Sequence, residues 1–148
     1  MEVQPDFREL LALLNKHAVE YIIVGDYALA FYGAPRFTGD IDIFVCPQSQ
    51  NAARILNALN EFGFGSAGLT EEDFSTPHKV VQLGAPPVRV DLITSLTGVS
   101  WEEVVATRAP GNYGDVPVFF IGRNEFIANK RAMGRKKDLA DIEALGEE

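Results

Sequence analysis

The sequence contains few of the residues on which several common kinds of site depend. Cys46 is the only cysteine among the 148 residues, which excludes a disulfide framework and a cysteine-rich zinc site. The histidines, His17 and His78, lack the spacing of metal ligands. A G-x-x-x-x-G-K phosphate loop and a nucleophile elbow are absent from the chain. The G-x-G-x-x-G string at 63–68 follows an expected helix rather than a strand, so it does not indicate a dinucleotide site.

Long apolar segments are also missing. No apolar run approaches the roughly 20 residues that are needed to cross a bilayer. The N-terminus carries Glu2 and Asp6 and has no basic segment followed by an apolar one, as a signal peptide would. We therefore expect a cytoplasmic protein without a membrane partner.

Positive charge is scarce, since 13 Lys and Arg face 21 Asp and Glu and the net charge is −8. Binding of long nucleic acid through a broad basic face is therefore not expected, because phosphate contacts need clustered Lys and Arg. A small polyphosphate ligand, or one structured RNA end at a local site, remains open. The length and the 47% of hydrophobic residues fit a single domain, 1–148, with one core.

Hydrophobic periodicity and turn residues predict the order of helices and strands. Asp6 with Glu9, and Ser100 with Glu103, have the spacing of helix-capping pairs. Helices are expected at 6–17, 27–32, 48–62, 100–107, 124–133 and 136–145. Strands are expected at 21–24, 41–45, 79–83, 88–94 and 116–121, with a turn-rich loop at 110–115. This mixed order, with a hairpin at 79–94, predicts an α+β (α/β) domain with a mixed sheet flanked by helices.

Two aspartates lie inside an apolar, β-branched segment, GDIDIFV at 39–45. Along a strand Asp40 and Asp42 point to one face, while Ile41 and Ile43 enter a core. Neighbouring carboxylates repel and raise each other's pKa. A cation would remove that penalty, and such hard oxygen ligands suit Mg²⁺ or Mn²⁺. An edge strand with a solvated acidic face is the alternative.

A third aspartate and a glycine turn extend this candidate site. Asp91 lies in a strand, RVDLI at 89–93, and joins the other two carboxylates if the strands are neighbours. Three such carboxylates can hold one or two divalent ions, which activate an attacking hydroxyl and stabilise a leaving phosphate oxygen. Gly25 lies between a strand and a helix N-terminus, a turn that suits a triphosphate. A single exposed strand aspartate and an ordinary tight turn are the alternatives.

These motifs resemble the nucleotidyltransferase superfamily with the DNA polymerase β-like fold. The matching segments are VGDYAL at 24–29 and GAPRFTGDIDI at 33–43, followed by the acidic strand. The pattern of the family is a Gly-Gly or Gly-Ser turn, a short helix and R-x-T-x-D-x-D. More narrowly, the chain is similar to small bacterial nucleotidyltransferase-like proteins, including the AbiEii-type toxins of toxin–antitoxin systems. Weaker matches in the tail are Lys130, Arg135, Lys137, Asp138 and Asp141.

The resemblance covers about residues 21–145 and implies a metal-dependent nucleotidyltransferase with C-terminal helices. Such an enzyme moves a nucleoside monophosphate from a nucleoside triphosphate to a hydroxyl on RNA or protein, and a toxin or antitoxin partner is one setting. Asp40 and Asp42 would hold Mg²⁺ or Mn²⁺. Asp91 would bind one metal and help to deprotonate the acceptor hydroxyl.

The resemblance also implies a nucleotide site. Gly25 would let the backbone approach the β- and γ-phosphates, Arg36 and Thr38 would lie near the nucleotide, and Lys130 would contact a phosphate. Arg36 as a charge-balancing partner of the aspartates, and Thr38 as a β-former that opens the strand, are structural alternatives. The basic run at 130–137 is equally compatible with a solvated helix face.

Asp26 departs from the family pattern, because it replaces the second small residue of the turn. A carboxylate there caps the N–H groups that a triphosphate would need, and it repels phosphate oxygens. The second hypothesis is therefore a catalytically impaired nucleotidyltransferase-like binding protein or antitoxin-type partner. A plain structural domain with acidic strands is the third.

Overall fold

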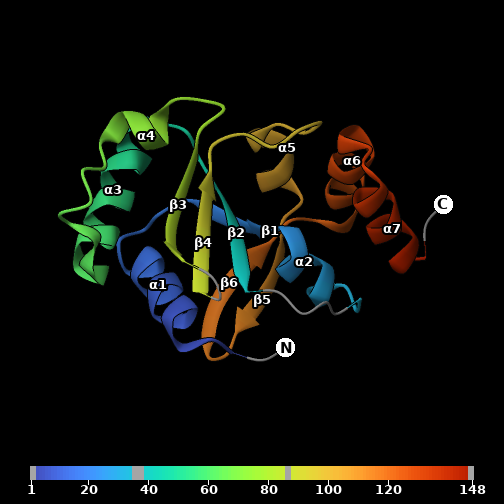
Figure 1. The fold of residues 1–148 in the computed structure, drawn as a ribbon, viewed down its shortest axis with the longest axis horizontal. Coiled ribbons are helices and arrows are strands. Elements are labelled where there is room, and N and C mark those ends of the chain that lie inside the picture. The colour runs from blue at the N-terminus through green and yellow to red at the C-terminus, as the bar shows by residue number, and fades with distance from the viewer. Residues whose placement is uncertain (1–2, 35–38, 86–87, 147–148) are drawn as a thin grey trace.

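The computed structural model describes residues 3–34, 39–85 and 88–146, which form one six-stranded mixed sheet with helices on both sides (Figure 1). The strand order is β3-β4-β2-β1-β6-β5. The strands are β1 (Tyr21–Val24), β2 (Asp40–Val45), β3 (Val80–Ala85), β4 (Val88–Ile93), β5 (Ala109–Tyr113) and β6 (Val116–Phe120). The helices are α1 (Pro5–Lys16), α2 (Gly25–Phe31), α3 (Ser49–Leu59), α4 (Glu71–Ser75), α5 (Trp101–Ala106), α6 (Arg123–Met133) and α7 (Lys136–Ala144), and a π-helical turn (Asn60–Phe64) follows α3.

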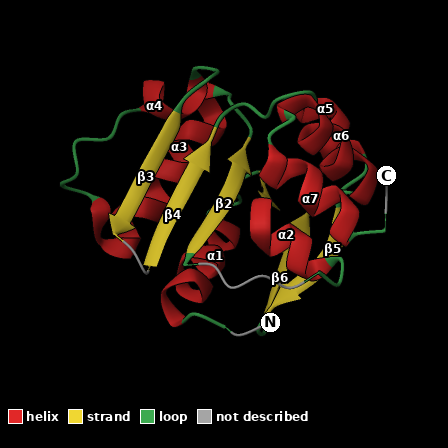
Figure 2. Cartoon of the chain, turned by 45° about the vertical axis from the view of Figure 1, so that its right-hand side comes forward, coloured by secondary structure: helices red, strands yellow, loops and turns green. Residues whose placement is uncertain are grey.

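The pairing of the central strands places both aspartate segments side by side. β2 is antiparallel to β1 and parallel to β4, while β3 and β4 form the expected antiparallel hairpin. Helices α1 and α3 lie behind β2 and β4 in Figure 2, whereas α2 and α7 lie in front of the β6–β5 half. Within the part of the chain that the structure describes, the near face of β3, β4 and β2 has no helix over it. A polar site on these strands can therefore reach solvent.

The core lies on the opposite, helix-covered face of β2. Ile41, Ile43 and Val45 are fully buried there, against the apolar sides of α1 and α3. Phe7, Leu10, Leu11 and Leu14 of α1 are the buried side chains expected from their helical spacing. The alternation of β2 is therefore as the sequence predicts: apolar side chains enter the core and aspartates face the open side.

Most expected elements are present, but the caps of two helices were predicted wrongly. The α1 helix begins after Gln4, whose side chain accepts a 2.7 Å hydrogen bond from the amide of Asp6, and Pro5 takes the first helical position. For α6 the sequence predicts Asn124 as the cap, but the helix begins at Arg123 and its N-cap is Gly122, two residues earlier. The Ser100–Glu103 capping box of α5 is confirmed. Gly134 ends α6 in the left-handed conformation, with φ +67°.

The loop expected at 110–115 is wrong, because Ala109–Tyr113 forms the edge strand β5. A proline is tolerated in an edge strand, where its missing N–H leaves no ladder bond unmade. Pro110 lies opposite Phe119 of β6, and Gly114 closes the hairpin at φ +62°. The short helix α4, with its Thr70–Asp73 capping box, was also not predicted.

No helix among the described residues has the length and apolar character that crossing a membrane requires.

Candidate functional site

The centre of the site is the contact between Asp42 of β2 and Asp91 of β4. The parallel register pairs these residues directly, so their side chains leave the sheet on the same face. Asp40 lies one pleat away on that face, opposite Arg89. The structure thus brings the three aspartates together, as expected if the two strands were neighbours.

Gly25 closes this site on the β1 side. It follows Val24, which pairs with Asp42, and it adopts φ +68° at the start of α2. A Cβ built on Gly25 would collide with the Oδ2 atom of Asp42. Both the left-handed backbone and the lack of space therefore require glycine at this position.

The local charge makes Asp42 an unusual carboxyl group. The pKa of Asp42 is raised to about 6, first by burial and then by the carboxylates of Asp91, Asp26 and Asp40 in that order. When protonated, Asp42 can share its proton with Asp91. Asp26 therefore lies near enough to add its negative charge to the aspartate cluster.

Arg89 is the cation that already balances this cluster. Its Nη2 donates hydrogen bonds to Oδ2 of Asp40 at 2.7 Å and to Oδ2 of Asp91 at 3.2 Å. Its Nε lies 3.2 Å from Oδ1 of Asp91 without the alignment of a hydrogen bond, so both of these buried atoms have no hydrogen-bond partner in the described structure. One guanidinium therefore links β2 to β4, but it leaves Oδ1 of Asp91 without a hydrogen bond.

The donor set fits a hard divalent cation. Three carboxylates converge on one face, one of them carries a buried oxygen without a hydrogen bond, and another has a raised pKa. Nevertheless, no group of three His, Cys, Asp or Glu side chains in the described residues is arranged to hold a metal ion as it stands. The guanidinium of Arg89 contacts oxygens of Asp40 and Asp91 that an ion would need.

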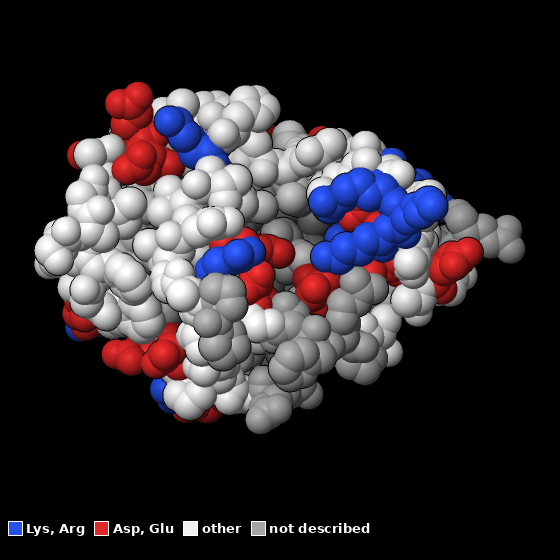
Figure 3. Space-filling model, viewed as in Figure 1, with Lys and Arg blue, Asp and Glu red and all other residues white. Residues whose placement is uncertain are grey.

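Figure 3 shows this arrangement on the surface. Acidic side chains gather in a hollow near the middle of the face, with a basic side chain beside them. A second, larger group of Lys and Arg side chains lies over α6 and α7 on the other side of the hollow. Negative and positive groups thus face each other across the hollow.

The comparisons with known proteins agree with this geometry. Residues 4–148 match the family model described as "Nucleotidyl transferase of unknown function (DUF2204)". The chain belongs to this family. A search of curated protein sequences found no match.

Solved structures with the same fold include several proteins described as nucleotidyltransferases. A candidate nucleotidyltransferase from Thermotoga maritima has a TM-score of 0.63 and 13% identity, over 96% of this chain and 93% of that one. The lincosamide antibiotic adenylyltransferase LnuA with bound lincomycin has a TM-score of 0.57 and 13% identity, over 97% and 96% of the two chains. An antigenic nucleotidyltransferase-like protein from Paracoccidioides brasiliensis has a TM-score of 0.53 and 20% identity, over 94% and 72%. These similarities show that the chain has the nucleotidyltransferase fold, which its sequence motifs had predicted.

The structure places Lys130 away from solvent. Lys130 is 5% exposed, and its Nζ lies 3.2 Å from Asp141 and 3.5 Å from Asp138. Arg135 donates a 2.7 Å hydrogen bond to Asp138, which holds the pKa of that carboxyl at about 2. Lys130, Asp138 and Asp141 of the tail motif therefore form a buried cluster that joins α6 to α7, and a phosphate role for Lys130 stays a prediction.

The two remaining nucleotide-site residues, Arg36 and Thr38, lie outside the described residues. Sequence reasoning gave no role to Arg89, although its spacing to Asp91 places both on one face of β4. That i, i+2 spacing was the signal that could have identified Arg89 as the counter-charge of the site.

Proposed function

We propose that this chain transfers a nucleoside monophosphate from a nucleoside triphosphate to a hydroxyl group, with Mg²⁺ or Mn²⁺ held by Asp40, Asp42 and Asp91. The single observation that supports this most strongly is the pairing of Asp42 with Asp91 on adjacent parallel strands. Rigid strands suit such a site, because reacting groups must be held to about half an ångström. A bound divalent ion would polarise the α-phosphate and offset the charge of the leaving pyrophosphate.

The residues of the chain supply the rest of the reaction. The acceptor hydroxyl oxygen forms a bond to the α-phosphorus, the bond from that phosphorus to the bridging oxygen of the β-phosphate breaks, and pyrophosphate leaves. Asp91 would help to take the proton from the acceptor hydroxyl, beside Asp42, which would hold the metal. Gly25 would let the backbone of the β1–α2 turn approach the β- and γ-phosphates, because only a residue without a side chain fits in this turn beside Asp42.

A labelling experiment tests this activity. The protein is incubated with each α-labelled nucleoside triphosphate, Mg²⁺ or Mn²⁺, total RNA and cell lysate. Transfer of label by the wild type should disappear in Asp42→Asn and persist in Asp115→Asn. Asp115 is a matched control because it is exposed and bonded to Arg8. Absence of transfer under either metal, with the protein normally folded, would count against the enzyme.

The sequence-level hypothesis names RNA or protein as the acceptor and a toxin–antitoxin system as the setting. The same experiment distinguishes an RNA acceptor from a protein acceptor, since label moves either with the RNA fraction or with the protein fraction. A neighbouring gene for an antitoxin-like protein, and co-purification of its product, would support the toxin–antitoxin setting. The net charge of −8 makes a long nucleic acid the less favoured acceptor, because it repels an extended phosphate backbone.

The second candidate function is binding without catalysis. Asp26 supports it, because this carboxylate adds negative charge beside Asp42, where a triphosphate would approach. Arg89 supports it too, because it binds two of the three carboxylates in place of a metal. A protein that binds a partner, folds normally and transfers no label would match this alternative.

A further inference from the structure

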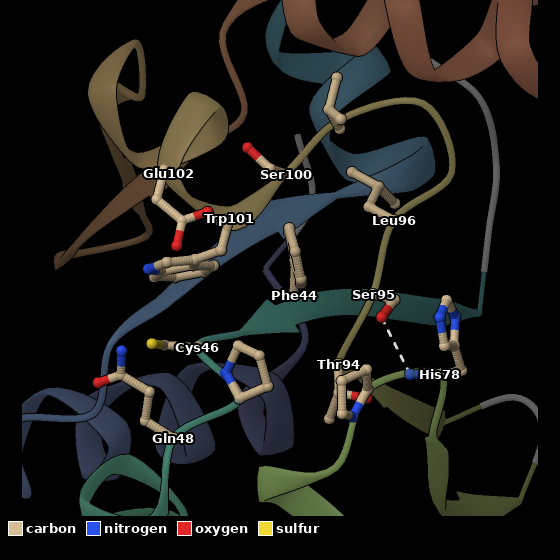
Figure 4. Close-up of a pocket in the computed structure, with 13 residues that line it drawn as sticks. Phe44, Cys46, Gln48, His78, Thr94, Ser95, Leu96, Ser100, Trp101 and Glu102 are labelled. Atoms are coloured by element: carbon tan, nitrogen blue, oxygen red, sulfur yellow. Dashed lines mark hydrogen bonds between the residues drawn. The ribbon is translucent and has the colours of Figure 1, made fainter.

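A second concave site lies on the same side of the sheet as the aspartates. It is a pocket of about 400 Å³ at the carboxyl ends of β2 and β4 and the start of α5 (Figure 4). Phe44 and Trp101 form an aromatic wall, with ring centroids 5.2 Å apart and planes at 86°. Polar groups of Ser95, Ser100 and Glu102 complete the lining. This volume is within the range of small-molecule sites.

The pocket lies at the ends of the same two strands that carry the carboxylates, on the same face of the sheet. Phe44 is two residues beyond Asp42 on β2, so both side chains lie on one face and about 7 Å apart along the strand. Beyond the end of β4, Ser95 follows Asp91 by four residues. Ile93 lies between them on the face and pairs with Phe44. A molecule seated against Phe44 and Trp101 can therefore extend one of its groups to Asp42.

The Gly25 turn and the pocket lie at opposite ends of β2. β1 runs antiparallel to β2 and pairs Val24 with Asp42, so Gly25 lies toward the Asp40 end. The pocket lies toward the Cys46 end. In an in-line displacement the attacking oxygen and the leaving pyrophosphate stand on opposite sides of the phosphorus. If the proposed function places the pyrophosphate at Gly25, the attacking hydroxyl comes from the pocket side.

The charge of the lining points to the kind of acceptor. None of the described residues that line the pocket is Lys or Arg, so no permanently positive side chain faces a phosphate or carboxylate group, and the polar lining consists of hydrogen-bonding groups such as Gln48 and His78. Glu102 contributes a negative charge, which favours an amine, and the aromatic wall favours an apolar face. Resting on the proposed function, we infer that this pocket binds the acceptor, a small hydroxylated molecule that carries an amine and one apolar face.

Trp101 provides a direct readout, because it is the only tryptophan in the chain. Its emission is followed while the protein is titrated with a matched pair of probes, benzyl 2-amino-2-deoxyglucoside and benzyl glucuronide. The two share a benzyl ring and hydroxyls but differ in charge. The amine should bind at least about tenfold more tightly. This preference should fall to less than about threefold in Glu102→Gln and persist in Glu143→Gln, an exposed residue of α7.

A second titration tests whether the pocket takes the acceptor or the nucleotide. The amine probe is titrated again in saturating Mg²⁺ and a non-cleavable α,β-methylene nucleoside triphosphate. An unchanged or tighter dissociation constant supports an acceptor pocket, whereas competition shows that the nucleotide occupies it and overturns the inference. Binding of neither probe, or equal binding of both, also overturns it.

The same titrations separate this inference from the proposed function. If the analogue binds by calorimetry and Asp42-dependent transfer persists while the probes fail, only the acceptor pocket is wrong. If the analogue does not bind and no label is transferred, the proposed function itself fails, and with it the assignment of the pocket to an acceptor.

Discussion

The guanidinium of Arg89 donates a 2.7 Å hydrogen bond to the carboxylate of Asp40 on the neighbouring strand. The same nitrogen also reaches Asp91. Two of the three carboxylates proposed to bind metal therefore share the single positive charge of a residue of the chain itself. A divalent ion and Arg89 compete for the same oxygens, so the side chain must move when the ion binds.

Arg89→Met should tighten Mg²⁺ and Mn²⁺ binding, because the competing cation is gone. Without metal, the variant should also be less stable than the wild type, since three crowded carboxylates lose their counter-charge. Calorimetry with each ion and chemical denaturation in a chelator measure the two effects. Arg8→Met, which breaks an exposed pair with Asp115, is the control and should leave metal affinity unchanged. Weaker metal binding by Arg89→Met would show that Arg89 supports the ion rather than replacing it.

Asp42 gives the metal-free protein a pH dependence of stability. Its pKa is about 6 in the folded protein against 3.8 for an ordinary Asp, so the native state retains a proton that the unfolded chain has released. The contribution of Asp42 to the free energy of unfolding should therefore be greatest below about pH 4. It should fall by about 2–3 kcal/mol as the pH rises to about 7. Urea denaturation in a chelator measures it.

Asp42→Asn should remove this fall, because the amide does not titrate. The pair of Asp138 and Arg135 does not interfere, since the pKa of Asp138 is about 2 and its stabilising effect is lost only as the pH falls toward that value. An identical slope in Asp42→Asn and wild type would contradict the role of Asp42.

Gly25→Ala should destabilise the protein by roughly 2–4 kcal/mol and weaken nucleoside triphosphate binding, because the new Cβ meets Asp42. Gly33→Ala is a matched control: its φ is +94°, yet nothing lies within 4 Å of its added Cβ. The excess loss in Gly25→Ala over Gly33→Ala measures the collision, and Asp42→Ala should rescue it. Equal losses of stability in both single variants would mean that backbone strain alone, and not a collision with Asp42, destabilises Gly25→Ala.

Asp26→Gly should tighten nucleoside triphosphate binding, because it removes a carboxylate from the first turn of α2 and from the surroundings of Asp42. Calorimetry with each triphosphate in Mg²⁺ measures the change. Asp6→Gly removes the corresponding first-turn carboxylate of α1 and should have no effect on affinity. Unchanged affinity in Asp26→Gly would mean that Asp26 does not hinder the nucleotide.

Lys130→Met should destabilise the protein by about 3–5 kcal/mol, because it leaves Asp138 and Asp141 buried without their shared cation. Arg135→Met should cost less, since the Arg135 side chain is 60% exposed. Thermal unfolding measures both. Triphosphate affinity, measured well below the melting temperature, should not change in Lys130→Met if the cluster is structural. A clear loss of affinity would instead support contact between Lys130 and a phosphate.

The sequence alone determined the elements that carry the site and the types of its residues. Alternation around Asp40 and Asp42 identified the open face of β2, because apolar side chains at Ile41 and Ile43 can only be buried on the other. The R-x-T-x-D-x-D segment at 36–42, together with the turn at Gly25 and the third aspartate, carried the resemblance to nucleotidyltransferases. Local chemistry was sufficient here, since strand alternation and a glycine turn depend on neighbours in the chain.

Only the tertiary structure decided which residues meet across strands. The parallel register of β2 and β4 placed Asp91 beside Asp42 and Arg89 beside Asp40, and the packing of α6 against α7 buried Lys130 between carboxylates. The edge position of β5 likewise made a strand of a segment whose composition predicts a loop. Register, burial and edge position arise from contacts between residues far apart in the chain, and no local pattern specifies them.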